Sequence, residues 1–444
     1  MATKKAQNFN KFYNGIGSSE WEQNMFHTLV NVDVHTKPGA AMCSKAFARA
    51  DSSIVDSVVN CRVVLPNGDI LMGTENGKIF KIVANSTVSL VHTDTQGPVR
   101  GIDYLGAYVY YATDDKLGRI GLSNASSESS WSTHNDSWAT FTVGGAYKHM
   151  IKQNLSLFIT DGYYVASVDN TGVFSPNVLD FEITQVTTSF VKIKDYLLIG
   201  TTQGSNGDKA GGYLWDTFSP SWSDSDEVQE RGINCFIDGD ELIYASIGLI
   251  GNIYYWNGTS FVFLFRLQDA GELVSTGINP YGSANLNGLP LLATSRGVYS
   301  IGRAKASMPI GQVIEYVPSL GQGTEIGALV TVASRVYFGY KSGSNYGIDK
   351  ITSNYATGII KTPVVVGKQS SVKAFYSSMP DGCSLELSIR NDGGSYVSKD
   401  FKKNDTDTMA YESKMIANKA IHQSMISLIP NGDTTPEIYD IEII

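Results

Sequence analysis

Short apolar runs separated by polar turns recur along the whole chain. In residues 70–82, an apolar run at 70–72 is followed by a polar turn at 74–77 and a second apolar run at 79–82. This pattern predicts a two-stranded hairpin, and an isolated hairpin is barely stable in water. Another element must therefore cover its apolar side.

The same composite pattern returns six more times downstream. An apolar run, a Gly or Ala, a Thr or similar residue, a Gly-containing turn and an aromatic-rich run follow in that order. The corresponding positions are Thr74, Thr113, Thr160, Thr201, Ser246, Thr294 and Tyr340. They lie 39 to 48 residues apart, about 44 on average, which is the period of a four-stranded β-propeller blade. We therefore predict an all-β chain with a seven-bladed propeller over residues 57–358, a count of six or eight being compatible with the pattern.

A further apolar segment precedes most of these hairpins and is the expected innermost strand of each blade. These segments are residues 58–65, 99–105, 147–153, 188–194, 233–239 and 327–333, and residues 277–290 are the weakest fit. Neighbouring blades would cover the hairpins, and the Gly or Ala would allow close approach near the channel. The alternative is a pair of β-sandwiches, whose strands also recur every 8–12 residues but have no reason to repeat a composite pattern.

The two ends of the chain lack this repeat. Residues 1–56 form a predicted N-terminal arm, which would donate a strand to the last blade, reach a neighbouring subunit, or remain a loosely docked leader. Residues 359–444 show period-two alternation, with Leu385, Leu387 and Ile389 on one face, and predict a C-terminal β-sandwich. Within them, only residues 409–421 are a candidate helix.

The composition and net charge of the chain limit the classes of partner that it is expected to bind. Aromatic residues make up 11% of the chain and charged residues 17%, with 44 glycines, as expected for short strands and tight turns. The net charge of −9 without a basic cluster excludes nucleic acid as the expected partner.

The N-terminus lacks the apolar core of a secretory signal, and the longest apolar runs are too short to insert into a membrane. Four scattered cysteines predict free thiols in a protein made in a reducing compartment: Cys43, Cys61, Cys235 and Cys383.

No sequence motif points to catalysis, so we predict that the chain is not an enzyme. Residues 167–174 resemble the Asp-box turn of sialidases, but Thr171 replaces the expected Gly and no second copy occurs. The acidic segments 223–227 and 404–408 lack EF-hand spacing and indicate solvated loops. The six histidines are isolated along the sequence: His27, His35, His92, His134, His149 and His422. We therefore predict no catalytic, cofactor-binding or metal-binding residue, and no cofactor.

Four tryptophans are the candidate surface-binding residues. Trp131 and Trp138 lie in the segment 122–141, and Trp215 and Trp222 lie in 211–228, all among Ser, Asp and Asn. Aromatic side chains flanked by small polar residues suit sugar stacking or protein contact. The alternative, which we favour, places them on the outer strands of two blades, packed on a neighbour.

The order of these parts resembles virion proteins of tailed bacteriophages that belong to the tail or tail tip. The resemblance is carried by Asn31 to Asp33 with Pro38-Gly39 before the propeller, and by the closing segment from Thr435 to Ile444. It implies a structural protein of the virion tail or fibre apparatus, assembled in the host cytoplasm, with other tail proteins as partners. It also implies homo-oligomerisation and attachment to a host-surface glycan or protein receptor. No functional residue is carried over from the group.

Two other functions remain open at this point. The first is a carbohydrate-binding lectin or scaffold propeller. The second is a glycan-active propeller enzyme, which would need a pair of carboxylates across the channel.

Overall fold

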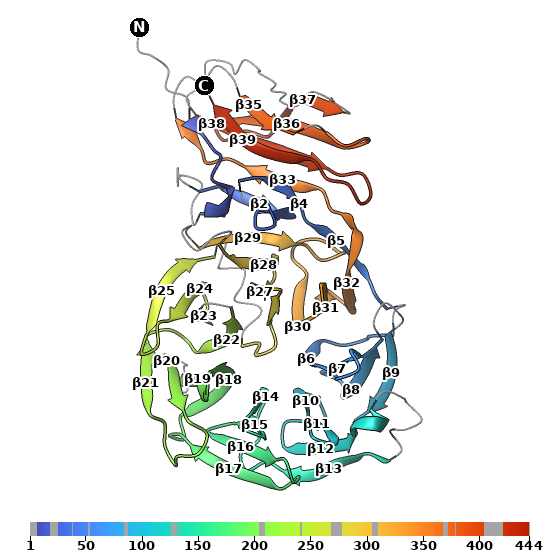
Figure 1. The fold of residues 1–444 in the computed structure, drawn as a ribbon, viewed down its shortest axis with the longest axis vertical. Helices are drawn as coiled ribbons and strands as arrows, with labels where there is room; N and C mark the ends of the chain where they lie inside the picture. The colour runs from blue at the N-terminus through green and yellow to red at the C-terminus, as the bar shows by residue number, and fades with distance from the viewer. Residues whose placement is uncertain are drawn as a thin grey trace.

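The computed structural model describes residues 7–17, 25–37, 39–51, 54–83, 88–125, 131, 133–203, 209–239, 242–267, 278–303, 310–366, 372–377, 379–403 and 421–443. These residues form a seven-bladed β-propeller with a β-sandwich beside it, which confirms the predicted fold class (Figure 1). The described segments contain two 3₁₀ turns, η1 (Phe12–Asn14) and η2 (Leu122–Asn124), among the strands. The candidate helix at 409–421 and the acidic segment 404–408 lie outside the described residues, apart from Ile421.

Each blade contains four antiparallel strands, which are named below from the central axis outward, and in blade 6 they belong to a larger sheet. Blade 1 contains β6 (Val59–Val64), β7 (Ile70–Thr74), β8 (Lys78–Ile82) and β9 (Val88–Thr93). Blade 2 contains β10 (Gly101–Leu105), β11 (Tyr108–Ala112), β12 (Lys116–Gly121) and β13 (Asn135–Thr140). Blade 3 contains β14 (Met150–Gln153), β15 (Ser156–Asp161), β16 (Tyr164–Asp169) and β17 (Phe174–Asp180). Blade 4 contains β18 (Gln185–Ile193), β19 (Tyr196–Gln203), β20 (Lys209–Trp215) and β21 (Asp224–Val228).

The remaining three blades complete the ring. Blade 5 contains β22 (Ile233–Asp238), β23 (Ile243–Ile247), β24 (Asn252–Trp256) and β25 (Phe261–Arg266). Blade 6 contains β26 (Ser283–Leu286), β27 (Leu289–Thr294), β28 (Gly297–Gly302) and β29 (Gly311–Tyr316). Blade 7 contains β30 (Glu325–Val332), β31 (Arg335–Ser342), β32 (Asn345–Tyr355) and β5 (Lys45–Arg49). Every predicted hairpin forms the second and third strands of one blade, and the weakest predicted inner strand is the short β26.

The recurring threonine closes the hairpin in several blades. Thr74 Oγ1 donates to the carbonyl of Lys78 at 2.8 Å and accepts its N–H at 3.1 Å. Thr113 makes the same pair of contacts with Lys116. These buried hydroxyls therefore add side-chain hydrogen bonds to the backbone groups of the turn.

The glycine before this position allows adjacent blades to touch. A Cβ on Gly73 would lie 2.5 Å from Val99 Cγ1, and a Cβ on Gly339 would lie 2.2 Å from Val59 Cβ. In each case the neighbour lies at or just before the inner strand of the next blade. The predicted close approach near the channel is therefore confirmed at these two positions.

The N-terminal segment closes the ring. Strand β5 pairs antiparallel with β32, with Ala48 opposite Lys350 and Phe47 opposite Ile351, and so forms the outer strand of blade 7. Phe47 packs against Tyr316 of blade 6 and Phe338 of blade 7, with ring centroids 5.3 and 4.7 Å away. Of the three roles predicted for the N-terminal arm, the structure confirms that it donates a strand to the last blade.

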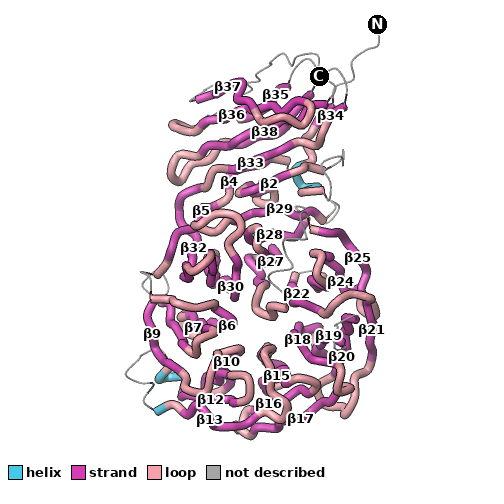
Figure 2. The backbone as a smooth tube through the Cα atoms, turned by 180° about the vertical axis from the view of Figure 1, so that it is seen from behind, coloured by secondary structure: helices cyan, strands magenta, loops and turns pink. Residues whose placement is uncertain are grey.

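The same N-terminal segment also supplies strands to the sandwich. One sheet continues directly from β29 of blade 6 through β2 (Thr28–Val30), β33 (Gly358–Lys361), β38 (Ile421–Ile429), β36 (Ser384–Asn391) and β37 (Val397–Lys403), with β34 (Val365–Val366) on β38 (Figure 2). The other sheet contains β1 (Gln7–Asn8), β39 (Glu437–Ile443), β4 (Ala41–Cys43), β3 (Val32–Asp33) and β35 (Val372–Tyr376).

One hydrophobic core spans the seam between propeller and sandwich. It joins Ile314 of β29 to Leu29 of β2, Leu387 of β36 and Ile441 of β39, all buried. The predicted boundaries at residues 56 and 358 fall between β5 and β6 and at the first residue of β33. All four cysteines are free, as predicted, and all four are buried. Among the described residues, no helix is long and apolar enough to cross a membrane.

Candidate binding site at the mouth of the central channel

A cavity of about 190 Å³ lies where the inner strands of several blades begin. It is lined by residues 58–60 of blade 1, Arg100 before blade 2, residues 146–148 before blade 3, residues 278–280 before blade 6, and residues 325–327 with 340–341 of blade 7. Inner strands run along the channel, so their first residues meet at one end of it. The cavity is therefore the mouth of the channel.

Two side chains link inner strands of different blades at the channel. The Tyr281 hydroxyl, next to blade 6, donates to the carbonyl of Lys148 and accepts the N–H of Met150 in blade 3, both at 3.1 Å. Arg62 of blade 1 donates from Nε to the carbonyl of Leu329 at 2.9 Å and from Nη2 to that of Ser283 at 3.2 Å. Because blades 3 and 6 are not neighbours, the Tyr281 contact must cross the channel, which is thus bridged beyond its mouth.

Each charged side chain that lines the mouth is paired with an oppositely charged group. Arg100 Nε lies 2.9 Å from Asp114 Oδ1, and its Nη1 contacts the carboxylate of Glu75. Lys341 lies 3.3 Å from Glu325. The mouth is therefore polar with balanced charge, which suits a neutral polar ligand better than a strongly charged one.

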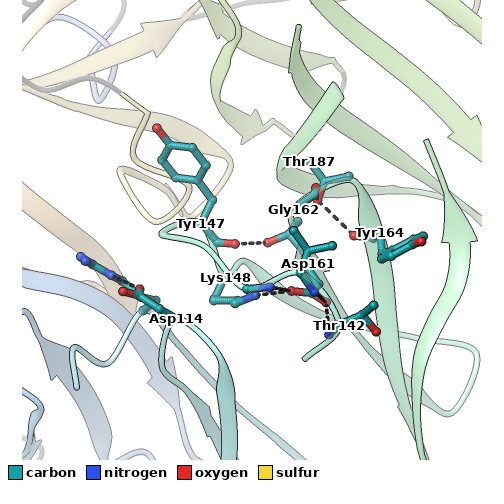
Figure 3. Close-up of polar contacts among 12 residues, drawn as sticks. Asp114, Thr142, Tyr147, Lys148, Asp161, Gly162, Tyr164 and Thr187 are labelled. Carbon is teal, nitrogen blue, oxygen red and sulfur yellow. Dashed lines mark hydrogen bonds and ion pairs between the residues drawn. The ribbon is translucent and has the colours of Figure 1, made fainter. Parts of the chain in front are cut away.

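A buried ion pair supports the rim of the mouth (Figure 3). Lys148 Nζ lies 2.7 Å from Asp161 Oδ1, and neither side chain is exposed. Asp161 also accepts the N–H groups of Thr142, Val143 and Gly144 at 2.8 to 3.2 Å. Burial lowers the pKa of Lys148, against the opposing effect of Asp161. The pair fixes the connection between blades 2 and 3, and it leaves Lys148 fully engaged with protein.

The four candidate tryptophans do not gather at one site. Trp131 and Trp215 are only 2% and 1% exposed, so neither offers a face to a ligand in this structure, and their burial supports packing within the protein. The predicted place on an outer strand is wrong for both, because Trp215 lies on β20, the third strand of blade 4, and Trp131 precedes β13. Trp138 of β13 packs on Tyr110, and Trp222 stacks on Phe181 with centroids 5.0 Å apart. Both are half-buried, and a surface-binding role for them stays a prediction.

Two acidic motifs are structural. Asp169 Oδ1 accepts the N–H groups of Thr171 and Val173 at 2.9 Å and closes the turn between β16 and β17. The segment 223–227, which we predicted to be a solvated loop, instead contributes most of strand β21. This prediction was wrong because serine and aspartate disfavour strands locally, whereas pairing with β20 overrides that preference.

Sequence reasoning missed one cluster. His134 and Asp136 are two residues apart, whereas His92 lies 44 residues before Asp136, yet the three offer ligand atoms within 4.8 Å of one another. His92 lies on β9 and Asp136 on β13, the outer strands of neighbouring blades. Nothing in the spacing of these residues indicates that two outer strands bring them together.

Comparisons with known proteins assign no family to this chain. No family model matches the chain, and no curated protein matches it. Among solved structures, the WD40 β-propeller domain of Doa1 is 11% identical, with a TM-score of 0.47, covering 69% of this chain and 96% of that one. The N-terminal domain of Nup159 is 14% identical, with a TM-score of 0.43, covering 69% and 95%. The computationally designed Ika8 protein is 14% identical, with a TM-score of 0.44, covering 70% and 86%.

Proposed function

We propose that this chain is a structural protein of a tailed-bacteriophage virion, forming part of the tail or its tip and fibre apparatus. The proposal starts from the order of parts in the sequence, an arm, a propeller and a terminal sandwich. It includes other tail proteins as partners, assembly in the host cytoplasm and a further role in attachment to the host surface.

The observation that best supports this role is the continuous sheet from blade 6 into the sandwich. Strand β29 pairs with β2, β2 with β33, and β33 with β38, so backbone hydrogen bonds run without interruption across the seam. The buried core on this seam prevents the two parts from hinging freely. A body of this kind transmits force and holds a fixed orientation, as a particle component must.

Closure of the ring supports the same role. Strand β5 covers the outer side of β32, which removes one unpaired sheet edge, and unpaired edges promote uncontrolled association. The ends of the chain are tied together as well, since β1 pairs with β39. Such an arrangement suits a protein that must persist outside cells.

The test is to locate the chain in particles. Phage particles from a lysate whose genome encodes this chain are purified on a density gradient, their proteins identified by mass spectrometry, and the chain localised with gold-labelled antibodies. The proposal predicts several copies per particle with label on the tail. Absence of the chain from particles that contain the other virion proteins would overturn it.

A second candidate, a carbohydrate-binding propeller, is favoured by the polar cavity at the channel mouth. Its charge balance and its amide side chains, Asn60 and Asn279, suit a neutral sugar. A glycan array probed with the purified chain tests this function, with Asn279→Ala as the variant expected to lose binding. Binding that survives this substitution would exclude the mouth as the sugar site.

A further inference from the structure

The cluster of His92, His134 and Asp136 has the donor set of a transition-metal site. The ligand atoms available are one imidazole nitrogen from each histidine and a carboxylate oxygen, all within 4.8 Å of one another. Asp136 lies between the two histidines: Oδ1 is 2.8 Å from His92 Nε2, and Oδ2 is 3.4 Å from His134 Nε2. Two imidazoles with one carboxylate are a common set for Zn²⁺ when a fourth position is left for water or another oxygen.

Hydrogen bonding presents His134 in the form that a metal requires. Its Nδ1 contacts the carbonyl of Trp131, and a carbonyl only accepts, so Nδ1 carries the proton. Its Nε2 is then unprotonated in the neutral ring and faces Asp136. A backbone carbonyl that fixes the tautomer in this way is a usual outer contact of histidine ligands.

The other ligands are also held by surrounding groups. The buried Tyr111 donates its hydroxyl to Asp136 Oδ1 at 2.7 Å. Trp131 stacks on the ring of His92, with centroids 4.8 Å apart and an angle of 14° between the planes. These contacts restrict the rotation of both side chains, so a bound ion would require only small movements.

A second, independent feature points to a missing ligand. Asp94 follows His92 by two residues, is 5% exposed, and its Oδ2 has no hydrogen-bond partner among the described residues. Asp94 directly follows β9, which carries His92, but its oxygens are not among the ligand atoms that lie within 4.8 Å of one another. A buried carboxylate oxygen without a partner is costly, and a nearby cation would offset that cost.

We propose that His92, His134 and Asp136 bind a Zn²⁺ ion between the outer strands of blades 1 and 2, with water as the fourth ligand. The ion would connect β9 to β13 and to the residues just before it. The site lies on the fourth strands of two neighbouring blades, at the edge of each sheet that faces away from the channel. The sequence alone predicted no metal-binding residue.

The test measures Zn²⁺ binding to the full chain after treatment with a chelator. Isothermal titration calorimetry is expected to give one equivalent per chain, and Zn²⁺ to raise the melting temperature. Co²⁺ in place of Zn²⁺ is expected to show the intense visible absorption of a four-coordinate ion. His134→Gln and Asp136→Asn are each expected to weaken binding at least about tenfold, since even loss of an outer contact costs that much.

The matched control is His27→Gln, which removes a histidine outside the cluster and is expected to bind Zn²⁺ as the wild type does. Circular dichroism of each metal-free variant checks that it folds; His134 is 30% exposed, so its substitution is expected to be tolerated. The proposal is overturned if the wild type binds less than stoichiometric Zn²⁺. It is equally overturned if folded His134→Gln and Asp136→Asn bind as tightly as the control.

Discussion

Glu315 carries a carboxyl group buried at the seam between propeller and sandwich, and its burial is unfavourable for the charged form. Glu315 on β29 is 4% exposed, and its Oε2 has no hydrogen-bond partner among the described residues. Burial, together with the charge of Asp33, raises the pKa of this carboxyl to about 7. The side chain is therefore neutral in mildly acidic solution and resists ionisation at higher pH.

This shift predicts a pH-dependent stability. Because the folded pKa exceeds the unfolded value, the contribution of Glu315 is fully present below about pH 4.5 and is lost as the pH rises through about 7. Glu315→Gln removes the titration, so its unfolding free energy relative to wild type is expected to rise by about 3 kcal/mol between pH 4.5 and 8. Urea unfolding at both pH values measures this change.

The control for this prediction is Glu325→Gln, which removes an exposed glutamate paired with Lys341. The unfolding free energy of Glu315→Gln relative to wild type is compared at the two pH values. If it did not change with pH, or changed no more than that of Glu325→Gln, the fold would not keep the Glu315 carboxyl neutral.

Strands could be predicted from the sequence where the residues that indicate them lie close together along the chain. An apolar run, a threonine and a turn lie within about fifteen residues, so the hairpins of all seven blades could be located. Strand β26 was the least certain because it has only four residues, including Asn285 and a single large apolar side chain, Leu286. The strands β1 to β4, of two or three residues each, carry no periodicity at all.

Contacts between blades depend on small residues at fixed positions. Gly339→Ala places a Cβ 2.2 Å from Val59 Cβ, at the junction between blade 7 and blade 1. We expect a loss of about 1–3 kcal/mol in unfolding free energy from this overpacking. Gly121→Ala is the matched control, since its Cβ would lie 3.6 Å from Nδ2 of Asn124, an ordinary van der Waals distance.

Guanidinium unfolding of the two variants compares them directly. If Gly339→Ala proved as stable as Gly121→Ala, blades 7 and 1 would not be in the close contact that a closed ring requires.

At the scale of the whole molecule, the segment before the first blade determines how the parts join. It supplies four strands to the sandwich and one to blade 7, so the two ends of the chain are built into shared sheets. The sequence predicted the donated strand as one of three alternatives, but not the continuous sheet through β29, β2 and β33. Strands that pair although hundreds of residues separate them leave no local pattern in the sequence. The cluster formed by His92 and Asp136, which lie on different blades, leaves no local pattern either.

Disulfide trapping tests ring closure by the N-terminal strand most directly. In the variant Ala48→Cys/Lys350→Cys, the two thiols replace residues that face each other across β5 and β32, while the native cysteines are buried. We predict an intramolecular disulfide in the monomer, identified by peptide mapping, and none in the control Ala48→Cys/Lys81→Cys. Absence of this cross-link, or its formation only between two chains, would contradict closure of the ring by its own N-terminal strand.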